Sequence, residues 1–110
     1  MSYQLVIGAR FKQVSRRFFK KYASFVDDFE QLIAELKSNP QAGVSLGRDC
    51  FKVRMRIKSK NTGKSGGARV ITCVKVVGEK IYLLTIYDKS EQDTISDNER
   101  DDLLKENGLL

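Results

Sequence analysis

The 110-residue sequence contains no histidine or tryptophan, one proline and two cysteines. Without histidine, the chain lacks the side chain most often used as a general base and as a metal ligand. Cys50 and Cys73 are too few for a disulfide framework, and they lack the spacing of a metal site. We therefore expect neither a metal nor another cofactor, and a reducing cytoplasm as the location.

Long hydrophobic runs are also absent. No apolar stretch approaches the roughly 18 residues of a membrane helix, and no secretory signal opens the chain, so we expect no membrane span. Because the composition is nonetheless 41% hydrophobic with a single proline, we expect a folded protein. The length predicts one domain, residues 1–110, with a single modest core.

Positive charge is abundant and unevenly distributed. Residues 1–69 contain 15 Lys and Arg against 5 Asp and Glu, a net charge of +10, whereas residues 70–110 contain 5 against 9, a net charge of −4. A basic body of this kind predicts a polyanionic partner, for which nucleic acid is the first choice. The charge alone would also fit an acidic protein or a membrane surface.

Hydrophobic periodicity predicts an α+β domain in which a small antiparallel sheet carries two N-terminal helices and a C-terminal helix. The expected order is β-α-α-β-β-β-α. Strands are expected at residues 3–7, 51–60, 68–77 and 80–87, and helices at residues 10–22, from 24 to the Asn39-Pro40 pair, and from 96 onward. Ser24 with Asp27, and Ser96 with Glu99, are helix-start signals.

Cations occupy every second position of the second expected strand: Lys52, Arg54, Arg56, Lys58 and Lys60. Because successive side chains of a strand point to opposite faces, the pattern predicts one apolar and one cationic face. Same-face neighbours lie roughly 6.6–6.8 Å apart, close to the spacing of phosphates on an extended nucleic acid. Protection of an edge strand would explain one or two lysines, whereas a phosphate-binding face explains the whole row.

A hairpin is expected next, centred on the glycine-rich tip NTGKSGG at residues 61–67. Keeping the valines of both strands on the apolar side predicts a register that pairs Lys58 with Arg69. Arg69 then joins the cationic face. The tip can present Lys64 and backbone N–H groups to a phosphate, or it can be a flexible turn without a ligand.

These residue types suit RNA cleavage without a metal. Attack of a 2′-hydroxyl on the adjacent phosphate needs a base, an acid and cations around the developing charge. Crowded like charges favour the neutral form of a lysine, so Lys52 is a candidate for proton transfer, and arginine can act as a clamp. The acidic residues are expected in the second helix and the C-terminal part, away from the basic face.

The chain resembles the RelE/HigB toxins of bacterial type II toxin–antitoxin modules. The similarity runs through KYASFVDDFEQLIAELKSNPQAG, CFKVRMRIKSK, GKSGGARVIT and YLLTIYDKSE, which is nearly the whole chain. It implies a RelE-like fold and a ribosome-dependent mRNA interferase. It also implies mRNA and rRNA in the ribosomal A site as partners, together with a cognate antitoxin, a small helix-turn-helix protein.

The resemblance further implies a catalytic set of Lys52, Arg54, Arg69 and Lys89. In this reading the two arginines stabilise the transition state, while the two lysines orient or protonate the phosphate and the leaving group. Some relatives carry a C-terminal tyrosine or histidine base that this chain lacks, so the base stays open. We expect RNA to be bound by Arg56, Lys58, Lys60, Lys64, Arg16, Arg17 and Lys20.

Two alternatives remain. A toxin of the same fold can act by binding, as ParE relatives inhibit DNA gyrase, or the chain can be a non-enzymatic RNA-binding module. The arginine-rich strand and the GGAR sequence favour the nuclease, since a gyrase binder needs no clamp for phosphate. A binding module would not depend on Arg69 in particular.

Overall fold

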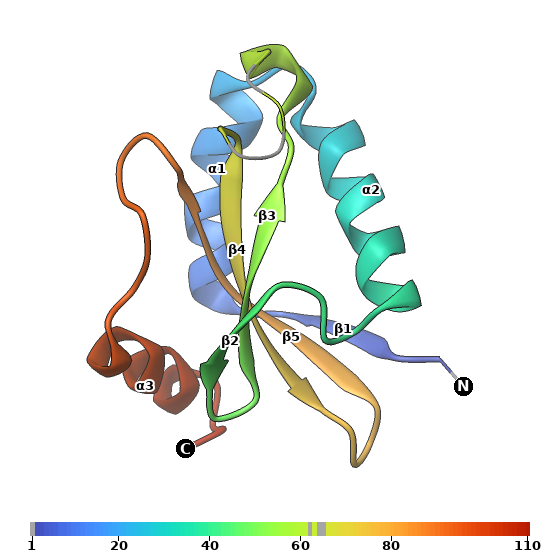
Figure 1. Cartoon of the computed structure of the whole chain (residues 1–110), viewed down its shortest axis with the longest axis vertical. Coiled ribbons are helices and arrows are strands. Elements are labelled where there is room, and N and C mark those ends of the chain that lie inside the picture. The colour runs from blue at the N-terminus through green and yellow to red at the C-terminus, as the bar shows by residue number, and fades with distance from the viewer. Residues whose placement is uncertain (1, 62, 64–65) are drawn as a thin grey trace.

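The computed structural model describes residues 2–61, 63 and 66–110, and it shows one five-stranded sheet with helices packed against both faces (Figure 1). No helix in these described segments is long and apolar enough to cross a membrane. The elements are β1 (Gln4–Ile7), α1 (Ala9–Lys21), α2 (Phe25–Ser38), β2 (Val44–Gly47), β3 (Cys50–Met55), a 3-10 turn η1 (Lys58–Lys60), β4 (Ala68–Lys75), β5 (Lys80–Asp88) and α3 (Asp97–Glu106).

The predicted fold class is confirmed, with two differences. A short strand, β2, forms where a loop was expected, and it pairs antiparallel with the start of β3. The strand order is β1-β5-β4-β3-β2, and β1 runs parallel to β5. The expectation of a purely antiparallel sheet is therefore wrong at β1, because this strand pairs with the last strand of the chain rather than with the next one.

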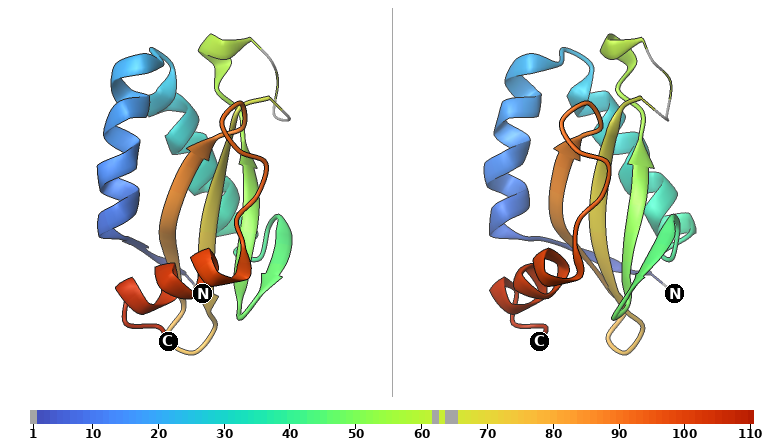
Figure 2. Two further views of the ribbon diagram at one scale, coloured as in Figure 1. Left: turned by 90° about the vertical axis from the view of Figure 1, so that its left-hand side faces the viewer. Right: turned by 60° about the vertical axis from the view of Figure 1, so that its left-hand side comes forward.

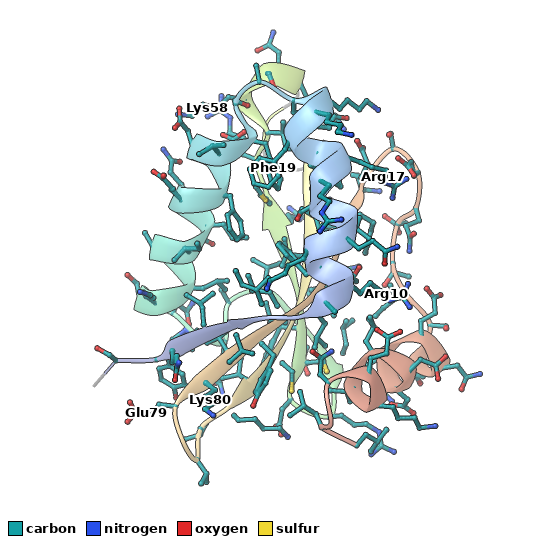
Figure 3. The ribbon with its side chains drawn as sticks, turned by 180° about the vertical axis from the view of Figure 1, so that it is seen from behind. Arg10, Arg17, Phe19, Lys58, Glu79 and Lys80 are labelled. Atoms are coloured by element: carbon teal, nitrogen blue, oxygen red, sulfur yellow. The ribbon has the colours of Figure 1, made fainter. Side chains whose placement is uncertain are left out.

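The helices α1 and α2 lie side by side on one face of the sheet (Figure 3). Their buried side chains recur at helical spacing and pack on buried side chains of β3 and β4, as the periodicity predicts. Fully burying one such side chain contributes roughly 1.5–3 kcal/mol. α2 ends at Ser38, immediately before the Asn39-Pro40 pair, because a residue preceding proline avoids the helical conformation.

The other face of the sheet is covered only in part. α3 begins with the predicted capping box between Ser96 and Glu99, and it buries Leu103 and Leu104 against a second cluster that includes Ile71. The connection between β5 and α3 runs back along the strands to reach the helix (Figure 2). The end of β3 and β4 distant from α3 is therefore left for the candidate site.

The predicted cationic strand is shorter than expected. β3 ends at Met55, and the chain then turns into η1. The backbone N–H of Lys58 donates to the Asp28 carboxylate at 3.0 Å, and that of Ser59 donates to Ser24 Oγ at 2.9 Å. Since the start of α2 satisfies these backbone groups, the strand does not continue, and a single cationic row to residue 60 is wrong. Ser24 consequently makes no capping bond to its own helix.

The register of β3 and β4 also differs from the prediction. Arg54, not Lys58, lies opposite Arg69, and Val53 pairs with Val70. The shift is four residues, and because it is even, the side chains within β3 and β4 keep their predicted faces. The cause is the length of the connection: β3 already meets β4 near Gly67, where an added Cβ would lie 2.1 Å from the Met55 carbonyl oxygen.

A buried polar network fixes the end of β5. Asp88 is 3% exposed and accepts hydrogen bonds from Lys60 Nζ at 2.7 Å, from the Tyr22 hydroxyl, and from the Ser90 N–H at 3.0 Å. Burial alone would raise the pKa of Asp88, but these hydrogen bonds hold it well below its usual range. The network therefore ties α1, η1 and the beginning of the β5–α3 connection together.

We predict that Asp88→Asn lowers the free energy of unfolding by about 3 kcal/mol, because it leaves the Lys60 ammonium buried without its counter-ion. Urea unfolding at neutral pH measures the loss. Because the pKa of Asp88 is lower in the folded than in the unfolded protein, its carboxylate stabilises the fold at pH values above the pKa of the unfolded state. The difference in free energy of unfolding between the variant and wild type should therefore shrink as the pH falls below about 4. The double variant with Lys60→Gln should cost less than the sum of the two single changes. Additive costs would contradict a coupled pair.

Candidate functional site

A groove of about 550 Å³ lies over β3 and β4, between the α2–β2 segment and the β5–α3 connection. This volume falls within the roughly 300–1,000 Å³ of small-molecule sites. Its lining residues are Glu35, Gly43, Val44, Lys52, Val53, Arg54, Arg69, Lys89 and Asp93. The structure thus brings the four residues of the expected catalytic set into one groove, although they come from three separate segments of the chain.

Arg54 and Arg69 form the centre of the groove. They are directly opposite each other across β3 and β4. Arg69 is 4% exposed and donates from Nη1 to the Ala68 carbonyl at 3.1 Å, whereas Arg54 is exposed. Like charges placed opposite each other in a sheet repel, so the contact between these two residues is unfavourable by itself. Two arginines at opposite positions of neighbouring strands can, however, both donate to one bound anion.

Lys52 lies two residues before Arg54 on the same face of β3 and is partly buried. Its backbone is closely approached by Gly43, which has φ +97° and whose added Cβ would lie 2.3 Å from the Lys52 carbonyl oxygen. A side chain at residue 43 would therefore push apart the wall of the groove. Glycine at this position allows the chain before β2 to lie against β3.

Lys89 is the first residue after β5, and its position is fixed through the backbone. Its N–H donates to the Gly67 carbonyl at 3.1 Å, and the preceding residue is the buried Asp88. The Lys89 ammonium group forms an ion pair with Asp93, four residues further along the chain. The buried network described above therefore positions one of the expected catalytic lysines.

Two carboxylates also reach the groove, which sequence reasoning did not predict. Glu35 comes from α2, and Asp93 comes from the β5–α3 connection. The expectation that acidic residues lie away from the basic face is wrong for both. For Asp93 the sequence did contain a signal, because Asp93 follows Lys89 by four residues. A single turn of the backbone between them is enough to bring the two side chains together.

Comparison with known proteins gives the family and the fold of the chain. A family model described as the RelE toxin of the RelE/RelB toxin–antitoxin system matches residues 11–108. The chain belongs to the RelE toxin family. Among solved structures, a mutant of the E. coli toxin RelE in the free state matches with a TM-score of 0.61 and 17% sequence identity, over 84% of this chain and 90% of that chain. At this identity the likeness shows the fold.

The cations expected to bind RNA beyond the groove of this RelE-family protein are dispersed. Arg56 and Lys58 are exposed beyond the end of β3. Lys60 is turned inward to Asp88, so its expected place on an open cationic face is wrong. Lys64 lies outside the described residues.

The basic residues of α1 lie on the other face of the sheet from the groove. Arg16, Arg17 and Lys20 are exposed. Arg17, which is labelled in Figure 3, also lines a second cavity of about 370 Å³ between α1, β5 and α3, whose other lining residues include Glu99 and Asp102. Among the described residues of the RelE-family chain, the groove and the exposed side of α1 are therefore two separate basic surfaces.

Tyr87 of β5 lines the second cavity and contacts the connection that carries Asp93. Its hydroxyl donates to the Asp93 carbonyl at 3.2 Å. Burial raises the pKa of Tyr87, although the nearby Arg69 opposes this change. A phenol held in its neutral form and already donating a hydrogen bond is poorly suited to act as a base. Tyr87 instead anchors the connection that carries Asp93.

Proposed function

We propose that this RelE-family toxin is an mRNA interferase, a ribosome-dependent endoribonuclease that cuts mRNA in the ribosomal A site. The observation that carries the proposal is the cross-strand pair of Arg54 and Arg69, set in a groove with Lys52 and Lys89. Four cations around one groove suit the charge of a phosphodiester. The cost of opposing like charges is recovered when an anion binds between them.

The proposed reaction is attack of a 2′-hydroxyl on its adjacent phosphate, with no metal. Negative charge grows on the non-bridging oxygens in the transition state, and donors held in advance stabilise it most. Arg69 fits this role because its guanidinium is nearly buried and already oriented by the Ala68 carbonyl. Arg54, exposed at the opposite strand, closes on the phosphate from the other side.

Lys52 and Lys89 take the roles that need a proton or a mobile charge. An ammonium group can orient a phosphate oxygen and can donate a proton to the leaving 5′-oxygen, which a guanidinium cannot do near neutrality. Both lysines lie at the groove, one on β3 and one after β5. Cleavage of this type leaves a 2′,3′-cyclic phosphate on one product and a 5′-hydroxyl on the other.

Three macromolecular partners follow from the proposal. The exposed cations of α1 contact rRNA while the groove holds mRNA, because the two basic surfaces face different directions. A cognate antitoxin, proposed to be a small helix-turn-helix protein, neutralises the toxin. The site of action is the cytoplasm, where the ribosomes are.

Induction of the protein in bacteria, followed by mapping of mRNA 5′ ends, tests the activity. We predict new 5′-hydroxyl ends clustered within codons. Arg54→Ala and Arg69→Ala should each reduce cleavage by roughly 100-fold or more, since each removes a donor to the transition state. Arg48→Ala is the matched control, because this exposed arginine pairs with Asp101 outside the groove. It should cleave as wild type does.

Growth arrest with intact mRNA and an induced DNA-damage response would contradict the interferase and favour a gyrase inhibitor. RNA binding without either effect would favour a binding module. New ends carrying a 5′-phosphate would contradict attack by the 2′-hydroxyl, even if cleavage depended on both arginines.

A separate prediction concerns α1. The double variant Arg16→Ala with Lys20→Ala should bind ribosomes more weakly, and its affinity should depend less steeply on salt because fewer counter-ions are released. Ribosome co-sedimentation at several salt concentrations measures the slope. Lys37→Ala with Lys105→Ala removes the same charge from exposed positions in the last turns of α2 and α3. Equal slopes for the two double variants would contradict rRNA contact by α1.

A further inference from the structure

Asp93 holds two of the groove cations, although it belongs to the connection after β5. Its carboxylate forms an ion pair with the Lys89 ammonium group. Its backbone carbonyl accepts a hydrogen bond from the Tyr87 hydroxyl at 3.2 Å, and Lys52 Nζ lies within 3.5 Å of the same oxygen. One acidic residue therefore contacts both lysines of the proposed catalytic set.

Electrostatic attraction, rather than packing, keeps the Asp93 side chain at the groove. The hydrogen bond and charge of Lys89, followed by the charges of Lys52 and Arg69, lower the pKa of Asp93. At the same time 79% of the side chain is exposed. Glu35 is the other carboxylate that lines the groove, and it comes from the opposite side, on α2.

A phosphodiester bound in the groove would compete with Asp93 for the same cations. Both groups are anions, and two like charges about 4 Å apart repel each other. We propose that Asp93 occupies the anion site of the groove in the free protein and that RNA, the ligand under the proposed function, binds by displacing its carboxylate.

The contacts of Asp93 allow this exchange without unfolding of the connection. Tyr87 holds the carbonyl and not the carboxylate, so rotation of the exposed side chain releases Lys89 while the backbone stays anchored. The buried Asp88 and its bonds to Ser90 keep the start of the connection in place. Asp93 is thus a removable counter-ion on a fixed backbone.

The exchange favours ligands with several phosphates. When a single inorganic phosphate binds, it only replaces the Asp93 carboxylate by another anion. The net gain in binding free energy is therefore small. An RNA strand displaces the same carboxylate and also reaches Arg54, which is exposed beside the site. The counter-ion therefore neutralises part of the positive charge of the groove until a polyanion binds.

The test measures the affinity of the whole chain for a fluorescent RNA of about ten nucleotides whose 2′-O-methyl groups prevent cleavage. Asp93→Asn keeps the size of the side chain and removes its charge, and it should bind this RNA about tenfold more tightly than wild type. Asp93→Glu keeps the carboxylate and should stay within about twofold of wild type. Circular dichroism of each variant verifies the fold.

Asp49→Asn is the matched control for the change in net charge. Asp49 is also an exposed aspartate that pairs with one lysine, Lys75, at 3.3 Å, but it lies outside the groove. Its φ of 64° is a conformation that asparagine tolerates. Its affinity for the RNA should remain within about twofold of wild type, because no anion is displaced there.

Equal gains in affinity for Asp93→Asn and Asp49→Asn would overturn the inference, because the effect would then be one of net charge. Unchanged or weaker RNA binding by Asp93→Asn would overturn it as well. A different result would contradict the proposed function. If Asp93→Asn binds RNA more tightly but the protein leaves mRNA intact, the role of Asp93 as a counter-ion is supported and the nuclease activity is contradicted. If mRNA is cleaved but Asp93→Asn does not change the affinity for RNA, the nuclease activity is supported and the role of Asp93 as a counter-ion is contradicted.

Discussion

The register between β3 and β4 is the constraint on which the candidate site depends. Val53 and Val70 pair with each other and are buried in the core under α1 and α2. A slip of one residue would move these valines to the other face and expose them. With the apolar pair held in this way, the adjacent pair, Arg54 and Arg69, must lie opposite each other on the other face. The core therefore enforces a juxtaposition of like charges that the arginines themselves oppose.

Two aspartates of the chain after β5 have different roles near this juxtaposition. Asp88 is buried and engaged by Lys60, so it belongs to the fixed frame that positions Lys89. Asp93 is exposed and bound through charge, so it can be exchanged for a ligand. The same short stretch of chain after β5 thus supplies one permanent ion pair and one replaceable ion pair. The permanent ion pair keeps the fold in place, while the replaceable ion pair leaves the cations of the groove available to a ligand.

The sequence predicts the helices and the faces of the strands well, because these depend on local periodicity. The stripes of α1 and α2, the capping box at Ser96 and the stop before Pro40 are local signals, and all of them are found. The end of β3 could not be predicted, since it depends on Asp28 and Ser24, which are distant in sequence. Without that knowledge the alternating cations looked like one row.

In the candidate site, too, the features that depend on local periodicity could be predicted, and those that depend on distant residues could not. The gathering of Lys52, Arg54 and Arg69 follows from alternation and strand pairing, and an even register error left their common face unchanged. The inward turn of Lys60 and the arrival of Asp93 depend on the course of connections, for which periodicity gives no information. Cationic side chains could thus be found from sequence, but their counter-ions could not.

The central claim is that one phosphate binds between Arg54 and Arg69, and side-chain NMR of the arginines tests it most directly. The Nε–H signals are followed while a non-cleavable RNA is added to the labelled protein. The account predicts that the signals of Arg54 and Arg69 shift together and saturate with one affinity, while that of Arg48 stays in place. Shifts restricted to the arginines of α1, or saturation of Arg54 without Arg69, would contradict it.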